Sequence, residues 1–341
     1  MKGQLLLRGL RGLYIYAFLA AFTLVLFSYV GLTLSAPLAY QIAGENVTEI
    51  PTVRFLGLWV FSLPLTIPLP SPLSFEALFS GLVLLYAAMM ALTFVDKETD
   101  VLKATRLLRK GDIGGALKNS FFATVTLSAA LLVLTLGLMF VQESAGVETG
   151  SLRYEDELEY YVGATYAPVR EEIGFRSTFV GLIAFLAMTR HVPRDSSLRE
   201  TSIMVLSAFI YPGWLRRRLR KLIGREVIGS SLLFGIFLSS GVFGAYHFLL
   251  GGGWGVGKVS QAFLAGLFFG YIFVEYGLPA SIISHSTINY FLSTAGLLGV
   301  RYSLPILVFE LSLLLLGGLT LVYLAGVAKT RLSGSATLSG V

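Results

Sequence analysis

The chain has 341 residues, of which 55% are hydrophobic and 13% are charged. A soluble domain is about a quarter charged, so this composition excludes an ordinary soluble protein and predicts a polytopic membrane protein. Cysteine is absent, which excludes disulfides, thiolate zinc sites and cysteine nucleophiles. We attribute the modest net charge of +6 to loops that orient the chain in the membrane, and we expect no nucleic-acid partner.

Long apolar runs predict an all-α transmembrane bundle of about eight spans. The first run is some 25 residues long, whereas a signal-peptide core has about 7–15 residues, so we expect an uncleaved first span. The predicted spans are residues 12–36, 72–95, 119–141, 166–190, 227–250, 258–276, 279–298 and 302–327.

Two stretches between these runs are expected not to cross the membrane. Residues 55–71 are apolar but contain Pro64, Pro68 and Pro70, which interrupt a helix, so we interpret them as a re-entrant or interfacial segment. Residues 96–118 carry six basic residues interspersed with apolar ones, a pattern that predicts an amphipathic helix on the membrane surface.

The distribution of basic residues predicts an orientation. Lysine and arginine concentrate in residues 1–11, 96–118, 190–226 and 329–331. Cytoplasmic loops are enriched in these residues, and eight spans with both termini in the cytoplasm place all four segments on that side. The acidic residues 142–165 then lie outside. We expect a prokaryotic cell membrane as the location.

The fourth predicted span opens with two adjacent carboxylates, Glu171 and Glu172, followed by Arg176. Ionisable groups at membrane depth are costly, so they indicate a functional site. Glu172 and Arg176 share one helix face and predict an ion pair, whereas Glu171 points about 100° away and is left free to act. The structural alternative is that the three residues only tie helices together or lie among the lipid headgroups.

Two further one-turn spacings lie in other apolar runs. Phe243 and His247 are four residues apart in the fifth predicted span, and His285 and Asn289 are four apart in the seventh. A lone histidine is usually structural, but the chain has only three histidines and three asparagines. Two of the histidines lie in apolar spans, and one of them is paired with an asparagine, so we single them out; His191 lies in a basic loop and receives no role.

In order, the motifs read EExxxR, FxxxH and HxxxN on three separate predicted spans. They resemble the intramembrane type II CAAX prenyl endopeptidases, the Ras-converting kind, and the wider CPBP or ABI family. The resemblance covers about residues 165–295, and the first 160 residues carry no matching motif. We therefore divide the chain into N-terminal spans with re-entrant or interfacial segments, residues 1–118, and a CPBP-type core, residues 119–341.

The resemblance implies an intramembrane endopeptidase that works without a metal. Its substrate would be a lipidated, CAAX-like or otherwise membrane-associated peptide, cut near its C-terminus by glutamate-activated water. Glu171 would be the general base, His247 would help to hold the water, and His285 and Asn289 would donate to the oxyanion. The residues implied to support the site are Glu172, Arg176 and Phe243.

Two alternatives remain open from the residues themselves. Glu171, His247 and His285 would supply a two-histidine, one-carboxylate zinc set, although the chain contains no HExxH motif. A non-catalytic immunity or scaffold protein of the same fold would bind a partner without cleaving it, and it would tolerate loss of Glu171.

The depth of the site is a further open question. Charge bias places Glu171 and His247 near the outer ends of their helices, yet eukaryotic members of the family cleave prenylated tails on the cytosolic face. Either the fourth helix begins earlier, near Leu158, and the site lies mid-membrane, or this protein opens to the other side.

Overall fold

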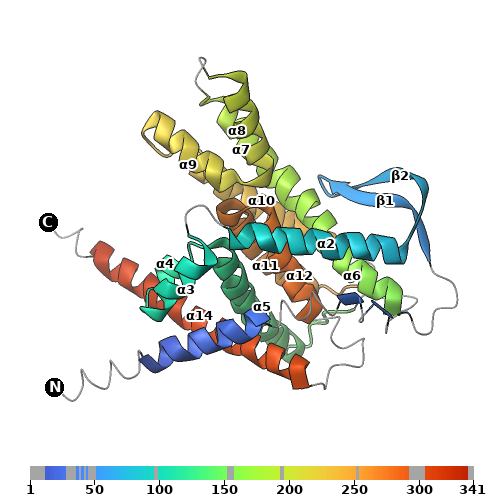
Figure 1. Ribbon diagram of the computed structural model, residues 1–341, viewed down its shortest axis with the longest axis horizontal. Helices are drawn as coiled ribbons and strands as arrows, with labels where there is room; N and C mark the ends of the chain where they lie inside the picture. The colour runs from blue at the N-terminus through green and yellow to red at the C-terminus, as the bar shows by residue number, and fades with distance from the viewer. Residues whose placement is uncertain are drawn as a thin grey trace.

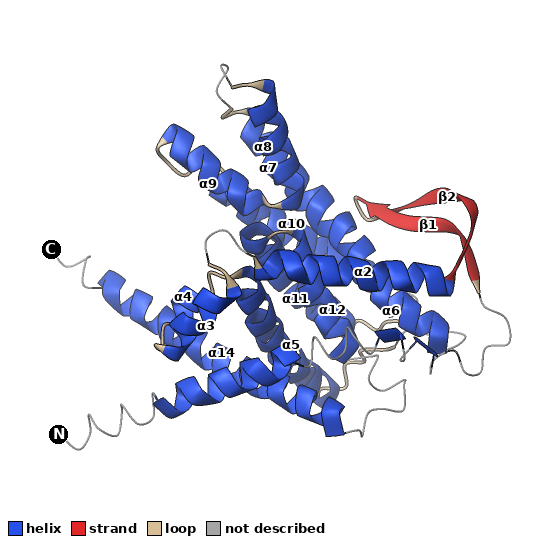
Figure 2. Ribbon diagram, viewed as in Figure 1, coloured by secondary structure: helices blue, strands red, loops and turns tan. Residues whose placement is uncertain are grey.

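The structure, a computed structural model, describes residues 12–27, 36–37, 40–41, 44, 51–95, 99–151, 157–192, 196–250, 253–291 and 304–336. These residues form a bundle of helices with a two-stranded hairpin at its side (Figures 1 and 2). The predicted all-α polytopic class is therefore confirmed, and the hairpin is an addition to it.

Six helices of the described chain are long and apolar enough to cross a membrane, which makes the protein an integral, multi-pass membrane protein. They are α2 (Phe75–Phe94), α5 (Ser120–Ser144), the continuous helix Glu157–Thr189, α10 (Gly229–Leu250), α11 (Gly257–Tyr276) and Leu307–Lys329 within α14 (Leu304–Ala336). The other two predicted spans also contain helices, but the described parts, Gly12–Phe27 and α12 (Leu278–Asn289), are shorter than a membrane crossing. The structure thus supports six of the eight predicted spans by length.

The proline-rich segment is a β-hairpin of strands β1 (Thr52–Val60) and β2 (Leu63–Ser74). The prediction that it is not a continuous helix is confirmed. Val60 and Leu63 flank the two-residue turn and form a hydrogen-bonded pair, and every second pair beyond them is not hydrogen-bonded. Pro64, opposite Trp59, and Pro68, opposite Phe55, are in such non-hydrogen-bonded pairs. Their missing N–H groups therefore remove no hydrogen bond between the strands.

The turn of this hairpin is held by the bundle. Phe61 and Ser62 both have positive φ, 51° and 62°, which is costly for residues other than glycine. The backbone N–H of Phe61 donates to Thr178 Oγ1 (3.2 Å), and that of Ser62 donates to the Gly174 carbonyl (3.3 Å). The hairpin tip therefore rests on the helix that carries the predicted site (Figure 1).

The predicted surface helix is present as α3 (Val101–Arg109), followed by the short α4 (Ile113–Ala116). Ala104 and Leu108 are buried, whereas Arg106 and Arg109 are exposed, which confirms its amphipathic character. Lys97, which belongs to the same prediction, lies outside the described residues. The second basic segment forms α8 (Leu198–Ile210) and α9 (Pro212–Ile223).

Three consecutive elements form the helix that carries the two carboxylates: α6 (Glu157–Glu171), the π-helical η1 (Glu172–Val180) and α7 (Gly181–Thr189). The helix begins at Glu157, nine residues before the predicted Tyr166, so the alternative start near Leu158 is the correct one. Glu171 ends the 15 residues of α6 in a helix of 33 residues. It therefore lies close to the midpoint of this span, where π-helical turns often mark functional sites.

The buried core lies around α5, α11, α12 and the beginning of α14. Small residues let helices approach closely, as the Gly266 and Gly270 spacing indicates. A Cβ added at Gly266 would lie 2.9 Å from Ser240 of α10, and one added at Gly270 would lie 2.9 Å from Ile236. This tight packing of α10 on α11 brings the FxxxH motif next to α11 and α12.

Candidate active site

The predicted site residues of η1 and α12 converge in the buried interior of the bundle. Glu172 and Arg176 are fully buried, and Glu171 and His285 are 8% and 4% exposed. They come from elements more than a hundred residues apart in the chain, which pack side by side. An apolar interior would not hold four ionisable side chains unless they interact with one another.

Glu172 is the most saturated carboxylate of the cluster. Its Oε2 accepts a hydrogen bond from Ser281 Oγ (2.5 Å) and lies 3.4 Å from Arg176 Nε. Its Oε1 accepts from His285 Nδ1 at 2.9 Å. The predicted Glu172–Arg176 ion pair is therefore confirmed, and both oxygens of Glu172 are engaged by protein partners.

Arg176 is held by charge and by aromatic faces. Its guanidinium carbon lies 4.3 Å from the ring centre of Phe243 and 5.5 Å from that of Phe269. None of its three guanidinium nitrogens makes a hydrogen bond within the described part of the chain. The positive charge thus depends on Glu172 and on the negative ring faces, so Phe243 serves as a direct support of this cation.

His285 lies between the two carboxylates. While Nδ1 is bound to Glu172, Nε2 lies 3.6 Å from Glu171 Oε2, which is too long for a hydrogen bond. The imidazole stacks on Phe269 with ring centres 4.6 Å apart at 17°. The hydrogen bond to Glu172 and the stacking on Phe269 fix the orientation of the ring, so Nε2 points toward the Glu171 carboxylate.

His247 lies half-buried on α10 with one nitrogen fixed. Its Nδ1 is 2.8 Å from the Phe243 carbonyl oxygen, which can only accept, so Nδ1 carries the proton. Nε2 is then the acceptor of the neutral ring. The charge of Glu171 acts on this histidine. The residue one turn before His247 thus supplies the backbone carbonyl that fixes the tautomer of the imidazole.

Asn289 is half-buried at the end of α12, one turn beyond His285. Its side-chain amide makes no hydrogen bond within the described part of the chain. His191, to which the sequence assigns no role, lies directly after the end of α7 and away from this cluster.

Several residues of the site carry no recognisable sequence pattern. Ser281 and Phe269 hold Glu172 and His285, and only the spacing of Ser281 one turn before His285 hints at this. The Trp59 ring of β1 lies 4.8 Å from that of Tyr246 and carries the Arg170 guanidinium over its face at 4.9 Å. A Cβ on Gly174 would collide with Trp59, which accounts for the glycine in the EEIGFR stretch.

Lys258, near the start of α11, adds a cation beside the cluster. Its Nζ lies 4.0 Å from the centre of the Trp254 ring, and its charge interacts with Glu171 and His247. It has no ion-pair partner within 4.0 Å in the described chain. Glu171 thus lies 3.6 Å from His285 Nε2 and also interacts electrostatically with His247 and Lys258.

The residues of the zinc alternative do not form a metal-binding group. Among the described residues, no set of three His, Cys, Asp or Glu side chains is placed to hold a metal ion. His285 Nδ1 is bound to Glu172 and His247 Nδ1 to a carbonyl, so each ring has only Nε2 to offer.

Residues 158–291 match the family model described as type II CAAX prenyl endopeptidase, Rce1-like. This segment contains the EExxxR, FxxxH and HxxxN motifs and begins one residue after the start of α6. The match supports the family that the three motifs indicated. No curated protein and no solved structure matches the chain.

Proposed function

We propose that the chain, through its Rce1-like segment of residues 158–291, is an intramembrane endopeptidase in which Glu171 activates a water molecule. The observation that carries the proposal is the asymmetry of the two adjacent carboxylates. Glu172 is bound by Ser281, Arg176 and His285, whereas among the described residues Glu171 has only the 3.6 Å approach of His285 Nε2. A carboxylate without a bound donor keeps its lone pairs for a proton transfer.

His247 and Glu171 give the water a defined place. His247 Nε2, the free acceptor of its ring, takes one hydrogen bond of the water while Glu171 removes the other proton. The water oxygen forms a bond to the scissile carbonyl carbon, and the carbonyl π electrons move to its oxygen. The oxyanion then re-forms the carbonyl as the C–N bond breaks, and Glu171 returns its proton to the leaving amine. The products are an amine and a carboxylic acid, which releases its remaining proton to water and becomes a carboxylate.

The oxyanion is stabilised from α12. Asn289 offers a side-chain N–H that no described residue uses, and His285 lies one turn earlier on the same face. Because Nδ1 of His285 donates to Glu172, only its Nε2 can face the reacting oxygen, and it donates to that oxygen when the ring carries protons on both nitrogens. Glu172, Arg176 and Phe243 act by holding His285 and the helices in place.

The substrate is a lipidated, CAAX-like or otherwise membrane-associated peptide. Glu171 lies near the midpoint of its helix, which is long enough to cross the membrane. A peptide reaches such a site from within the bilayer, and a lipid anchor would bring it there. The chain is oriented with both termini in the cytoplasm of a prokaryotic cell, as the charge bias predicts.

A cleavage assay on the purified full chain in detergent tests this function. The probe is a farnesylated CAAX peptide with a fluorophore, and mass spectrometry of the products locates the broken bond. Glu171→Gln keeps the shape of the side chain and removes the base, so turnover should fall by about 10²–10⁴-fold. Glu143→Gln, the same change at an exposed position of α5, is the matched control and should retain full activity.

Two outcomes would contradict the assignment. Near-normal turnover of the Glu171→Gln variant would remove the glutamate from the reaction. A wild-type chain that binds the peptide without cleaving it would instead favour the binding-protein alternative. The non-lipidated peptide, run in parallel, shows whether the lipid contributes to recognition.

The same assay tests independence from metal. We expect the rate to survive prolonged incubation with phenanthroline, because Glu171, His247 and His285 do not form a metal-binding group. Activity that is lost with the chelator and restored by added zinc would replace the glutamate mechanism by the zinc alternative.

A further inference from the structure

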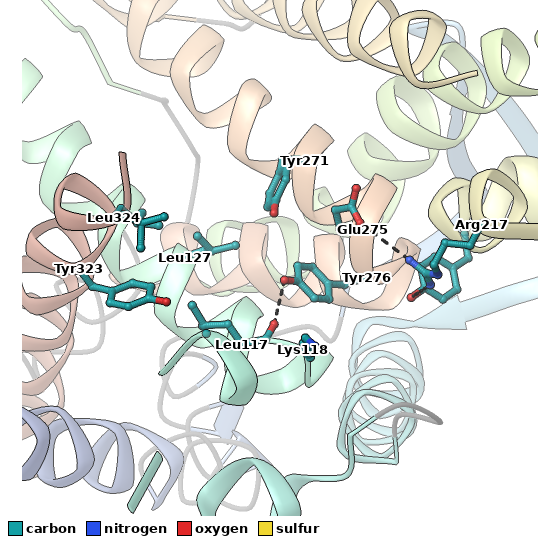
Figure 3. A pocket seen from close by; sticks show the side chains of 12 residues that line it. Leu117, Lys118, Leu127, Arg217, Tyr271, Glu275, Tyr276, Tyr323 and Leu324 are labelled. Atoms are coloured by element: carbon teal, nitrogen blue, oxygen red, sulfur yellow. Dashed lines mark hydrogen bonds and ion pairs between the residues drawn. The ribbon is translucent and has the colours of Figure 1, made fainter. Parts of the chain in front are cut away.

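A cavity lies at the end of α11 that carries Glu275 and Tyr276, apart from the candidate active-site residues. It has a volume of about 330 Å³ and is lined by residues of α5, α9, α11 and α14 and by the turn after α4 (Figure 3). Its lining includes Glu275 and Tyr276, one to two turns beyond Phe269 on α11. None of the residues assigned to the cleavage reaction lines it.

One side of the cavity is polar and has an excess of positive charge. Arg217 and Lys118 line it together with Glu275. Two arginines approach that carboxylate, Arg216 at 2.8 Å from outside the lining and Arg217 at 3.9 Å, so the sum of the charges stays positive. Arg217 Nη2 donates to Tyr211 Oη at 2.7 Å, which fixes the guanidinium at the rim. Lys118 is exposed and has no ion-pair partner among the described residues.

Tyrosine hydroxyls supply neutral hydrogen-bonding groups in the middle of the cavity. Figure 3 shows the hydroxyl ends of Tyr271, Tyr276 and Tyr323 pointing toward its centre. Tyr276 Oη donates its proton to the Leu117 carbonyl at 2.9 Å, so toward a ligand it acts only as an acceptor, as for a headgroup hydroxyl. Phosphate oxygens accept several hydrogen bonds at once, and the donors suited to them here are the two cations, Arg217 and Lys118.

The opposite side of the cavity is apolar and leads along membrane-spanning helices. Leu127 of α5 and Leu324 and Val327 of α14 line it. The same stretch of α14 presents Val322 at 65% exposure, as expected for a helix in contact with lipid tails. An amphiphile could therefore place its headgroup against the cations and a chain along α5 and α14.

The cavity also lies at the basic end of the bundle. It adjoins α9, which carries Arg216, Arg217, Arg218, Arg220 and Lys221, and the residues that follow α3. These are the segments that charge bias assigns to the cytoplasmic side. Anionic phospholipids of that leaflet attract such basic residues, and basic pockets between spans bind their headgroups.

We propose that this cavity is a binding site for the phosphate headgroup of an anionic phospholipid. Lys118 and Arg217 hold the phosphate, the three tyrosines line the space around the headgroup, and one acyl chain lies against Leu127 and Leu324. The site is independent of the cleavage reaction. It would join the peripheral helices α4 and α9 to the ends of α5, α11 and α14 through a lipid.

Native mass spectrometry of the delipidated protein in detergent tests the proposal. The probe is a phosphatidylglycerol, compared with a phosphatidylcholine that has identical acyl chains and with inorganic phosphate. We expect retention of phosphatidylglycerol, weaker retention of phosphatidylcholine, and no competition from phosphate at equal concentration. Lys118→Gln should weaken phosphatidylglycerol binding by about fivefold, the effect of one cation near a membrane surface.

Lys110→Gln is the matched control, because Lys110 is also exposed and basic but does not line the cavity. Leu324→Trp fills the apolar half and should weaken both lipids; the unfolding midpoint without lipid shows whether the variant is folded. Equal binding of the two lipids, equal effects of the two lysine variants, or displacement by phosphate would each overturn the proposal, the last in favour of a free-phosphate site.

Discussion

Two carboxylates of this protein are paired with arginines in opposite surroundings. Glu172 and Arg176 are both fully buried near the midpoint of a spanning helix, and aromatic rings surround the arginine. Glu275 and Arg216 lie at the basic end of the bundle, where their side chains are 21% and 29% exposed. The same two residue types therefore form a sealed pair in one region and a hydrated pair in the other.

The difference in solvation changes what each pair contributes. Water screens the charges at Glu275, so removal of one partner leaves the other solvated, and such pairs are worth about 0–1 kcal/mol. Removal of one partner of a buried pair leaves an uncompensated charge and costs about 3–5 kcal/mol. The buried cluster thus fixes one geometry for His285 and Glu171, whereas the exposed cluster can exchange partners at little cost.

The largest effect is expected from Arg176→Ala. Glu172 would then remain charged in the interior with only Ser281 and His285 as partners, and stability should fall by roughly 3–5 kcal/mol. The measurement is the free energy of unfolding in detergent, followed by tryptophan fluorescence.

The double variant Glu172→Gln with Arg176→Met sharpens this prediction. It removes both charges while keeping side chains of similar size, so it should be more stable than Arg176→Ala alone. An unfolding free energy for Arg176→Ala equal to that of the wild type would mean that the pair is solvated, and the contrast with Glu275 would be lost.

A smaller effect, confined to catalysis, is expected at the end of α12. Asn289→Ala and His285→Ala should each lower turnover by about two to three orders of magnitude, because an oxyanion donor in a dry site is worth about 2.7–4 kcal/mol. If Asn289 only ties helices together, the change should stay within a few-fold, since such contacts average about 0.6 kcal/mol. Steady-state kinetics on one lipidated peptide separates turnover from binding.

The unfolding midpoints of the two variants serve as the control, because the two side chains differ in their contacts. The side-chain amide of Asn289 makes no hydrogen bond in the described chain, so Asn289→Ala should leave the unfolding midpoint nearly unchanged. His285→Ala removes a partner of Glu172 and should lower both turnover and stability. Loss of peptide binding with turnover intact would move both residues from the oxyanion to substrate positioning.

The elements of the site that follow from local spacing can be predicted from the sequence. A helix places residues four apart on one face, and this rule alone predicts the Glu172–Arg176 pair and the freedom of Glu171. The convergence of three motifs on one cluster follows from the family resemblance rather than from spacing. Six of the eight predicted spans are supported by length because long apolar runs have few alternatives in a membrane.

The remaining features depend on contacts between distant segments. Ser281 and Glu172 are 109 residues apart, and no sequence pattern in either segment predicts their hydrogen bond. The hairpin was not predicted because prolines are rare in strands, and β2 contains several of them. In addition, its tip residues Phe61 and Ser62 are not typical of a turn with positive φ. The apolar run of the fourth span begins only at Tyr166 because the first turns of the helix are polar, so apolarity alone did not select the start at Glu157 over the later one.

The smallest effect is expected from Arg216→Ala, at the exposed pair. Arg216 Nη2 lies 2.8 Å from Glu275 Oε1, but Arg217 also approaches this carboxylate at 3.9 Å, so Glu275 keeps a cation after the substitution. Both side chains of the lost pair are partly hydrated, and we expect a change in unfolding free energy of about 0–1 kcal/mol, with unchanged cleavage.

Unfolding measured in low salt and in about 1 M salt provides the decisive contrast, because the screening length falls to about 3 Å at the higher concentration. The effect of Arg216→Ala should shrink in high salt, whereas the effect of Arg176→Ala should persist, since mobile ions cannot enter a fully buried pair. A loss for Arg216→Ala as large and as salt-resistant as that for Arg176→Ala would show that Glu275 is desolvated too, and the two regions would then share one electrostatic regime.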